Sequence, residues 1–211
     1  MPIIHKRRQL LITAAGAAAS SLIPVWALEK TPSMTEGPFY PRLADITLDD
    51  DNDLTRVKGK EGVARGTLLD LTGQVIDSGG KAAAGASVEI WQCNSHGRYH
   101  DARDVSSSPI DPFFQGFGKS VTDAGGRFRF RTIRPVAYPG RVPHIHFKVK
   151  SKAFRELTTQ MFVAGDPGLE EDFIWRSLRG VDLKKQMASE LKPAATTGGA
   201  ALAGFFDIML A

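Results

Sequence analysis

The sequence contains a single cysteine, Cys93, among its 211 residues. One cysteine cannot form a disulfide within the chain, and it excludes metal sites built from several thiolates. We expect Cys93 to pack as a small buried side chain. Outside its first ten positions the sequence has nearly balanced charge. Three of the 27 Lys and Arg residues lie within those ten positions, and the other 24 are nearly balanced by 23 Asp and Glu. No basic patch therefore predicts a nucleic-acid partner.

Long hydrophobic runs are confined to the N-terminus. Residues 1–27 combine a basic start with an apolar stretch rich in alanine and serine, which is typical of an export signal. The adjacent Arg7 and Arg8 resemble a twin-arginine signal. An uncleaved membrane anchor is the alternative, because the run over residues 10–28 is nearly long enough to span a bilayer, although its Gly, Ser and Pro24 weaken it. We expect an exported protein, periplasmic or extracellular, with no stable membrane insertion after processing.

Short strand-like segments separated by turns dominate from residue 63 onward. Two short pieces are expected within residues 66–80, and single strands are expected at 86–94, 126–133, 144–149, 157–165 and 204–210. The turns between them carry Gly, Asp and Asn. Strands of this length and spacing predict an all-β fold, an antiparallel β-sandwich over residues 63–211.

Less regular segments complete the predicted organisation. Residues 28–62 form an irregular N-terminal segment that includes an acidic run, best interpreted as a solvated loop. Residues 100–118 look unstructured, and long loops inside a compact domain are usually functional or mobile. Few short helices are expected, at 172–178 and 183–191. In the strand at 126–133, arginines alternate with phenylalanines, so the arginines are expected on its outer face.

The segment "HIHFKVK" carries the most informative spacing in the chain. Side chains alternate between the faces of a strand, so His144 and His146 share one face while Ile145 and Phe147 occupy the other. Two residues at this spacing have roots about 6.5–7 Å apart. Both imidazoles can then converge on one metal ion. A pair of polar residues on a half-buried strand is the alternative that spacing alone leaves open.

Histidine and tyrosine are scarce elsewhere, which limits the ligands that a metal site can draw on. After removal of the signal the chain keeps four histidines and three tyrosines. Tyr138 lies six residues before His144, and Tyr99 follows a predicted strand. Phenolate is a hard anionic donor that suits a hard, highly charged ion such as Fe(III). His96 and His100 flank Tyr99 and are expected to be solvent-exposed rather than ligands.

Three segments taken together resemble the intradiol ring-cleavage dioxygenases. They are "GQVIDSGGKAAAGASVEIWQCNSHGRYH", "TDAGGRFRFRTIRPVAYPGRVPHIHFKV" and "LTTQMFVAGDP", and the resemblance covers roughly residues 33–211. The branch of the family that contains the β chains of protocatechuate 3,4-dioxygenases is the most similar. The resemblance implies an enzyme that cleaves a catechol-type ring with O2 to a cis,cis-muconate.

The same resemblance implies a role for each motif residue. Non-haem Fe(III) would be held by two tyrosines and two histidines, namely Tyr99, Tyr138, His144 and His146. The substrate, a small aromatic diol, would displace Tyr138. Arg141 would bind the substrate and stabilise negative charge on it, and Gln160 would support the site from behind the ligands. Gly37 and Pro38, in "TEGPFYP", would line the substrate pocket.

Some features depart from the family pattern. The loop between Tyr138 and Arg141 is very short, and no room exists for the helical dimerisation domain of catechol 1,2-dioxygenases. An export signal is also unlike the cytoplasmic enzymes of aromatic catabolism. The choice of catechol, assembly into a homo-oligomer, and completion of the pocket by a second chain are therefore left open.

Two rival interpretations come from different classes of protein. Residues 73–90, followed by residues 122–130, also resemble prealbumin-like and carboxypeptidase-regulatory domains, which are non-enzymatic β-sandwich modules. Such modules have no need of the two tyrosines, the two histidines and Arg141 together. A different oxidase or hydrolase, with zinc or copper at the histidine pair, is the second rival. A red ferric-tyrosinate colour in the purified protein separates both from the dioxygenase.

Overall fold

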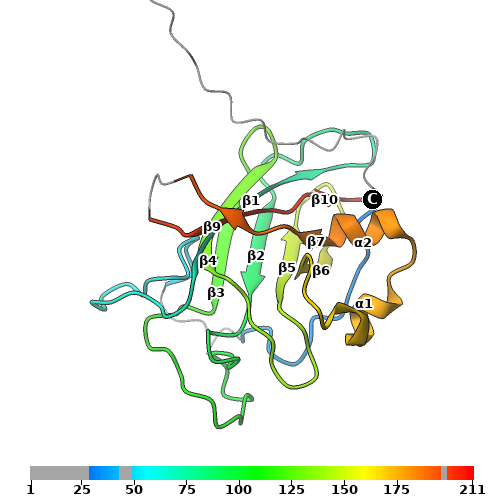
Figure 1. Cartoon of the computed structure of the whole chain (residues 1–211). Coiled ribbons are helices and arrows are strands. Elements are labelled where there is room, and N and C mark those ends of the chain that lie inside the picture. Colours follow the sequence, from blue (N-terminus) through cyan, green and yellow to red (C-terminus); the bar gives the residue numbers. More distant parts are fainter. Residues whose placement is uncertain (1–28, 43–48, 196–198) are drawn as a thin grey trace, which may run out of the picture.

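The computed structural model describes residues 29–42, 49–195 and 199–211 (Figure 1). The predicted export signal at 1–27 lies outside these residues. Two five-stranded sheets and a few short helices make up the described fold, which confirms the expected all-β sandwich. None of the helices in the described ranges combines the length and the apolar character needed to cross a membrane.

The first sheet is built around its longest strand. β1 (Leu68–Ile76) pairs antiparallel with β4 (Arg127–Ile133) on one side, and on the other side it pairs with two short strands in succession, β9 (Leu202–Phe205) and β10 (Ile208–Met209). Both short strands run parallel to β1, and β8 (Lys192–Pro193) pairs antiparallel with β9. The long pairings are thus antiparallel as expected, and the C-terminal strands make the sheet mixed.

The second sheet carries the histidine strand. Its strand order is β3 (Phe117–Val121), β2 (Ser87–Trp91), β5 (His144–Lys150), β6 (Leu157–Val163) and β7 (Ala188–Ser189). The pairings are antiparallel except for the short one between β6 and β7. β5 is therefore a central strand, flanked on both sides by ladders that fix its register.

Aromatic side chains fill the space between the two sheets. The ring of Phe147, on β5, lies 6.0 Å from that of Phe128, on β4, and 4.9 Å from that of Phe206. β4 alternates as expected, with Phe128 and Phe130 buried and Arg127 and Arg129 exposed. Ile145, Phe147 and Val149 therefore form the core-facing side of β5, where burying apolar area stabilises the fold by roughly 25 cal/mol per Å².

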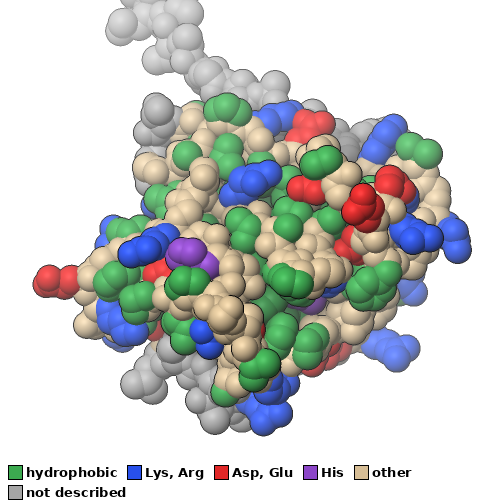
Figure 2. All heavy atoms as spheres, turned by 60° about the horizontal axis from the view of Figure 1, so that its bottom comes forward, with side chains coloured by type: hydrophobic (Ala, Val, Ile, Leu, Met, Phe, Trp, Pro, Cys, Tyr) green, Lys and Arg blue, Asp and Glu red, His purple; other side chains and the backbone are tan. Residues whose placement is uncertain are grey.

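The opposite face of β5 is buried too. His144 is 2% exposed, His146 3% and Lys148 6%. Only small areas of histidine colour are visible on the face drawn in Figure 2. The N-terminal segment is bound to the second sheet, since the amide of Met34 donates a hydrogen bond to the carbonyl of Thr158 on β6 at 2.8 Å. Buried polar side chains need polar partners or a ligand, so this face of β5 is the candidate for a functional site.

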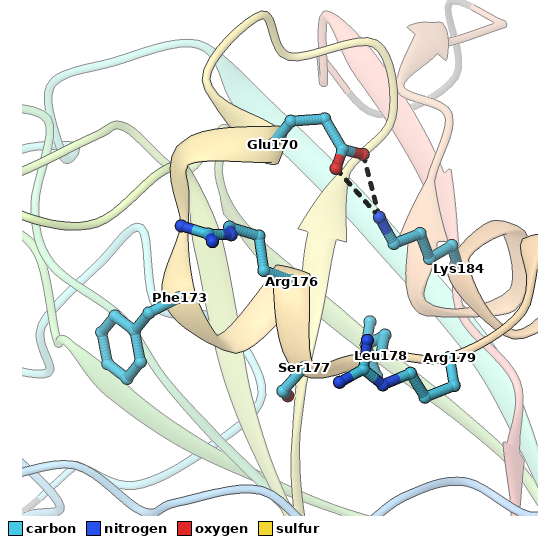
Figure 3. Close-up of a pocket in the computed structure, with 7 residues that line it drawn as sticks. All are labelled: Glu170, Phe173, Arg176, Ser177, Leu178, Arg179 and Lys184. Atoms are coloured by element: carbon cyan, nitrogen blue, oxygen red, sulfur yellow. Dashed lines mark hydrogen bonds and ion pairs between the residues drawn. The ribbon is translucent and has the colours of Figure 1, made fainter.

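Short helices follow β6 at the edge of the second sheet (Figure 1). They are the 3-10 turn η2 (Leu169–Glu171), α1 (Phe173–Ser177) and α2 (Val181–Met187), as expected for this part of the sequence. A shallow groove of about 620 Å³ lies between them (Figure 3). Its wall includes the ion pair between Lys184 and Glu170. The groove lies outside the histidine face.

Three expectations about strands need correction. Residues 68–76 form one strand rather than two pieces. Gly73 does not end this strand but is required within it, because a Cβ there would lie 1.9 Å from the carbonyl oxygen of Phe206. Residues 204–210 contribute to two short strands, β9 and β10, rather than to one closing strand. The segment expected to be unstructured up to residue 118 ends in a strand, since β3 begins at Phe117.

Candidate metal centre

The strand register brings His144 and His146 together as the spacing predicted. Their Nε2 atoms are 3.2 Å apart. The Nδ1 of His144 lies 2.6 Å from the carbonyl oxygen of Val142 and must donate to it, so the Nε2 of His144 keeps its lone pair. Burial, followed by the positive charge of Arg141, lowers the pKa of His144 to about 4. Burial and the neighbouring His144 hold the pKa of His146 well below its usual value. Both rings are therefore neutral at pH 7, the state in which imidazole binds metal.

A tight turn places Tyr138 beside this pair. Tyr138 and Arg141 exchange two backbone hydrogen bonds, of 3.2 and 2.9 Å, across Pro139 and Gly140. Gly140 has φ +84°, and proline followed by such a glycine is the arrangement that type II turns favour. The turn projects the Tyr138 ring to 5.5 Å from the ring of His144. The short loop between Tyr138 and Arg141 thus keeps the phenol of the first and the guanidinium of the second close together.

Tyr99 reaches the same place from the loop after β2. The side chain of Asn94 accepts hydrogen bonds from the amides of His96 and Arg98, and the carboxylate of Asp104 accepts one from the amide of Tyr99 at 2.7 Å. The Tyr99 ring then lies 5.6 Å from that of Tyr138 and 6.3 Å from that of His146. The two phenols and the two imidazoles therefore form one cluster, as the sequence predicted.

The two phenols of this cluster differ in burial, Tyr99 being buried and Tyr138 half-buried. The hydroxyl of Tyr99 is buried without a well-formed hydrogen bond. Burial first, and then the nearby Tyr138, raise the pKa of Tyr99 well above its usual value. Burial also raises the pKa of Tyr138, while the charge of Arg141 acts to lower it. Neither phenol ionises easily in the protein alone, and a bound cation would give the hydroxyl oxygen of Tyr99 the partner that it lacks.

The donor set fits a hard cation. Two neutral imidazole nitrogens converge with two phenols, one of which is an orphaned buried hydroxyl. Two phenolates would offset two charges of a trivalent ion and favour a hard one such as ferric iron. Within the described ranges no group of three or more His, Cys, Asp or Glu could hold a metal ion, so a metal site built on the histidine pair would need the tyrosines as further ligands.

Arg141 is anchored next to the cluster by three contacts. Its Nε donates to Oδ2 of Asp172 at 2.8 Å, and its Nη2 donates to Oε1 of Gln160 at 2.6 Å. Its Nη1 lies 3.3 Å from the Nε2 of His144. Gln160 in turn donates through Nε2 to the carbonyl of Thr35 at 3.0 Å. The predicted position of Gln160 behind the cluster agrees with these contacts, and the anchor Asp172 is a residue that sequence reasoning missed.

The N-terminal segment closes one side of the cluster. Gly37 has φ +70°, and a Cβ there would lie 3.4 Å from Cε1 of His146. Phe39 stacks on Tyr99 at 4.7 Å. Gly37 therefore lies next to His146, and its part in lining a substrate pocket stays a prediction. Pro38 is exposed in the turn that follows, and its part in substrate binding stays a prediction.

Four further side chains bear on the interpretation of the sequence. Cys93 is buried, as expected. His96 and His100 are half-buried rather than exposed, because the turns around Tyr99 fold back on them; Gly116, for example, packs against His100. Trp91 is the last residue of β2. It is fully buried, but its ring lies flat on that of His146, so it belongs to the surroundings of the cluster.

The comparisons with known proteins agree with this geometry. The family model described as "Dioxygenase" matches residues 35–142 and 139–211. The chain is 40% identical over 168 residues to the protocatechuate 3,4-dioxygenase beta chain of Burkholderia cepacia, a match that covers 76% of this chain and 71% of the relative. It is 32% identical over 169 residues to catechol 1,2-dioxygenase 2 of Acinetobacter lwoffii, covering 72% of this chain and 58% of the relative.

A solved structure gives the same result. The dioxygenase domain of a dioxygenase and carbohydrate-binding fusion protein from Streptomyces sp. SirexAA-E has a TM-score of 0.63 and 27% identity. That match covers 86% of this chain and 98% of the domain. The non-enzymatic prealbumin-like module is not favoured by these matches. The chain belongs to the intradiol ring-cleavage dioxygenase family.

Proposed function

We propose that this chain cleaves a catechol-type ring with O2, between the two hydroxylated carbons, to a cis,cis-muconate. The ligands of its metal are Tyr99, Tyr138, His144 and His146, and the metal is Fe(III). The observation that carries the proposal is the convergence of two neutral imidazole nitrogens with two phenols, one of them buried and the other half-buried. A structural sandwich module gains nothing from this arrangement, because each buried polar group without a partner costs stability.

The bound metal would supply Lewis acidity, which holds the two oxygens of the diol and activates the ring for reaction with O2. A proton of the diol substrate is taken up by a side chain of the protein. Tyr138 lies at an accessible turn and is half-buried, whereas Tyr99 is 4% exposed. The Oη of Tyr138 is therefore the atom that accepts a substrate proton. Burial raises the pKa of Tyr138 above its usual value, so its phenolate takes up a proton readily.

Arg141 acts by electrostatics. Its contacts with Asp172 and Gln160 fix the guanidinium, and an arginine has no lone pair with which to bind a metal. A preorganised cation at this position stabilises negative charge that develops on the substrate during ring attack. The guanidinium needs no reorganisation at that moment, because its partners hold it before substrate binds.

The proposal also includes the location of the protein, based on its N-terminal sequence, and its class of substrate, based on its relatives. The protein is exported through a twin-arginine signal, a route that carries folded proteins and so permits insertion of iron before export. The substrate is a small aromatic diol; relatives bear the names of protocatechuate 3,4-, catechol 1,2- and hydroxyquinol 1,2-dioxygenases. Nucleic acid is not a partner in this proposal, and the subunit number is a matter for direct measurement.

Oxygen uptake with a panel of diols tests the proposal. Protocatechuate, catechol and hydroxyquinol are each supplied to the purified protein, and the products are identified by mass spectrometry. The expected result is consumption of one O2 per diol, with both oxygen atoms of ¹⁸O₂ in a muconate-type product. The variant His144→Ala should be inactive, and His96→Ala serves as its matched control. Ring opening beside the diol rather than within it, or no uptake with any diol, would overturn the proposal.

A further inference from the structure

The two histidines of the cluster are oriented in different ways. The Nδ1 of His144 has a protein acceptor, the carbonyl of Val142. The Nδ1 of His146 is buried and has no hydrogen-bond partner among the described residues. Metal-binding histidines normally use the second ring nitrogen to fix the orientation of the ring. Among the described residues, no hydrogen bond at Nδ1 therefore sets the direction in which the Nε2 of His146 points.

Trp91 provides the surface that can do this. β2 and β5 pair so that Trp91 lies directly opposite His146 on the same face of the sheet. The two rings stack with centroids 4.8 Å apart and planes only 8° from parallel. By contrast, Tyr99 meets the same imidazole at a tilt of 60° and a centroid distance of 6.3 Å. A flat stack lets the imidazole turn in its own plane but opposes tilting out of it.

Trp91 is itself held in place by a chain of contacts that leads away from the cluster. Its side chain is fully buried, and the ring of Tyr40 meets it edge-on at 4.9 Å. The hydroxyl of Tyr40 donates to Glu89 at 2.8 Å. The Nζ of Lys148 lies 3.6 Å from the centre of the Tyr40 ring. The indole thus packs against His146 and also against a tyrosine that is fixed at both its hydroxyl and its face.

We propose that Trp91 is the positioning residue of His146, and that it sets the plane of this imidazole by stacking where the partner histidine relies on a hydrogen bond. The inference rests on the metal centre proposed above. Binding a cation withdraws electron density from the imidazole, so the bound ring is attracted more strongly to the electron-rich indole face than the free ring is. The stack therefore favours the metal-bound form and slows release of the metal.

Two substitutions at Trp91 and one control elsewhere test this role. Trp91→Phe keeps a flat aromatic face, whereas Trp91→Leu fills space without one. The control is Phe206→Leu, which opens a similar gap in the core between the sheets, against Phe147 and away from the histidine face. Each variant is purified with iron, and three properties are measured: the midpoint of thermal unfolding, the rate of iron transfer to a chelator, and the ferric electron paramagnetic resonance spectrum.

Trp91→Leu should release iron roughly 10–100-fold faster than the wild type, the range typical for loss of a group that orients a ligand. Its ferric spectrum should shift as well, because the imidazole plane is no longer fixed. Trp91→Phe should lie between Trp91→Leu and the wild type. Phe206→Leu should unfold at a lower temperature and yet keep the wild-type spectrum and release rate.

Two results would separate failure of this inference from failure of the metal centre. If Trp91→Phe and Trp91→Leu both keep the wild-type spectrum and release iron no faster than Phe206→Leu, the positioning role is wrong. If His144→Ala and His146→Ala keep their iron, the metal centre itself is wrong. Trp91→Phe retains the aromatic packing, so it decides the question even when Trp91→Leu does not fold.

Discussion

The carboxylate of Asp172 joins Arg141 to the start of helix α1. One oxygen, Oδ2, accepts from Nε of Arg141 at 2.8 Å, and the other, Oδ1, accepts from the amides of Ile174 and Trp175 at 2.9 and 3.0 Å. Burial alone would raise the pKa of Asp172, but the hydrogen bonds from Arg141 and from the helix amides together lower it. The carboxylate therefore stays ionised, and the position of the guanidinium is coupled to the end of a helix.

Arg141→Ala should separate electrostatics from metal binding. Because Arg141 is not a ligand, the variant should keep its iron, its red colour and the spectral shift on binding a catechol. Turnover should fall by roughly 10²–10³-fold, the effect expected for loss of one preorganised stabiliser. Arg141→Lys should recover only part of the rate, since a point charge cannot replace the planar fork that contacts Asp172 and Gln160. Iron lost along with the rate would make Arg141 structural instead.

Asp172 should act on the reaction through Arg141 and on stability through the helix. Asp172→Asn keeps an oxygen for the cap but leaves the buried guanidinium without its counter-charge, so kcat should fall while iron is retained. Removing one partner of a buried pair should also lower the free energy of unfolding by about 3 kcal/mol. Asp172→Ala should lose about 1 kcal/mol more, the usual value of an N-cap. The checks are denaturant unfolding and steady-state kinetics, and an Asp172→Asn variant with normal kcat would refute the coupling.

The cluster residues could be predicted because they lie in short-range patterns. His144 and His146 share a strand face through their spacing, and the turn at Pro139 and Gly140 keeps Tyr138 close to Arg141. Tyr99 was singled out by the scarcity of tyrosine and by the family resemblance rather than by any spacing, because it lies far from the other three residues in the sequence. Local patterns fix the order of side chains along an element, so they predict best what one element alone contributes.

Other features depend on pairings between distant segments. Trp91 lies opposite His146 only in the register that β2 and β5 adopt, and sequence alone does not specify it. Asp172 looks like any acidic residue before a helix until the fold brings Arg141 to it. Gly73 resembles a strand break, yet it is needed inside β1 because the backbone at Phe206 passes so close. Each case was decided by a contact between residues far apart in the chain.

Asp207 should make the protein less stable at neutral pH. Burial raises the pKa of Asp207 to about 6, although its Oδ1 accepts a hydrogen bond from the amide of Gln74. The folded state therefore binds the proton more tightly than the unfolded state does. Its stabilising contribution is complete below about pH 4 and is lost as the pH rises through 6. Asp207→Asn, which keeps the acceptor, should be more stable than the wild type at pH 7 by on the order of 2 kcal/mol.

Unfolding in urea at pH 4 and pH 7 measures this difference. The advantage of Asp207→Asn should be present at pH 7 and nearly absent at pH 4. Asp50→Asn removes the same charge from an exposed position and serves as the control. An equal gain in the two variants would show that net charge, rather than burial of Asp207, is responsible.

The paired arginines of the N-terminus should control export. Replacing Arg7 and Arg8 by lysine keeps the positive charge but removes the pair that a twin-arginine receptor reads. The protein should then remain in the cytoplasm, as followed by cell fractionation, whereas Lys6→Arg should leave export intact. Unchanged export of the double variant would exclude this route.

The central claim is that two tyrosines and two histidines hold one ferric ion. Its most direct test is the iron content of the purified protein, compared in the wild type, His146→Ala and His96→Ala. The last variant removes a half-buried histidine that the structure leaves out of the cluster. We predict about one iron per chain with a red ferric-tyrosinate band in the wild type and in His96→Ala, and the loss of both in His146→Ala. Full iron and colour in His146→Ala, or stoichiometric zinc or copper in a colourless wild type, would contradict the account.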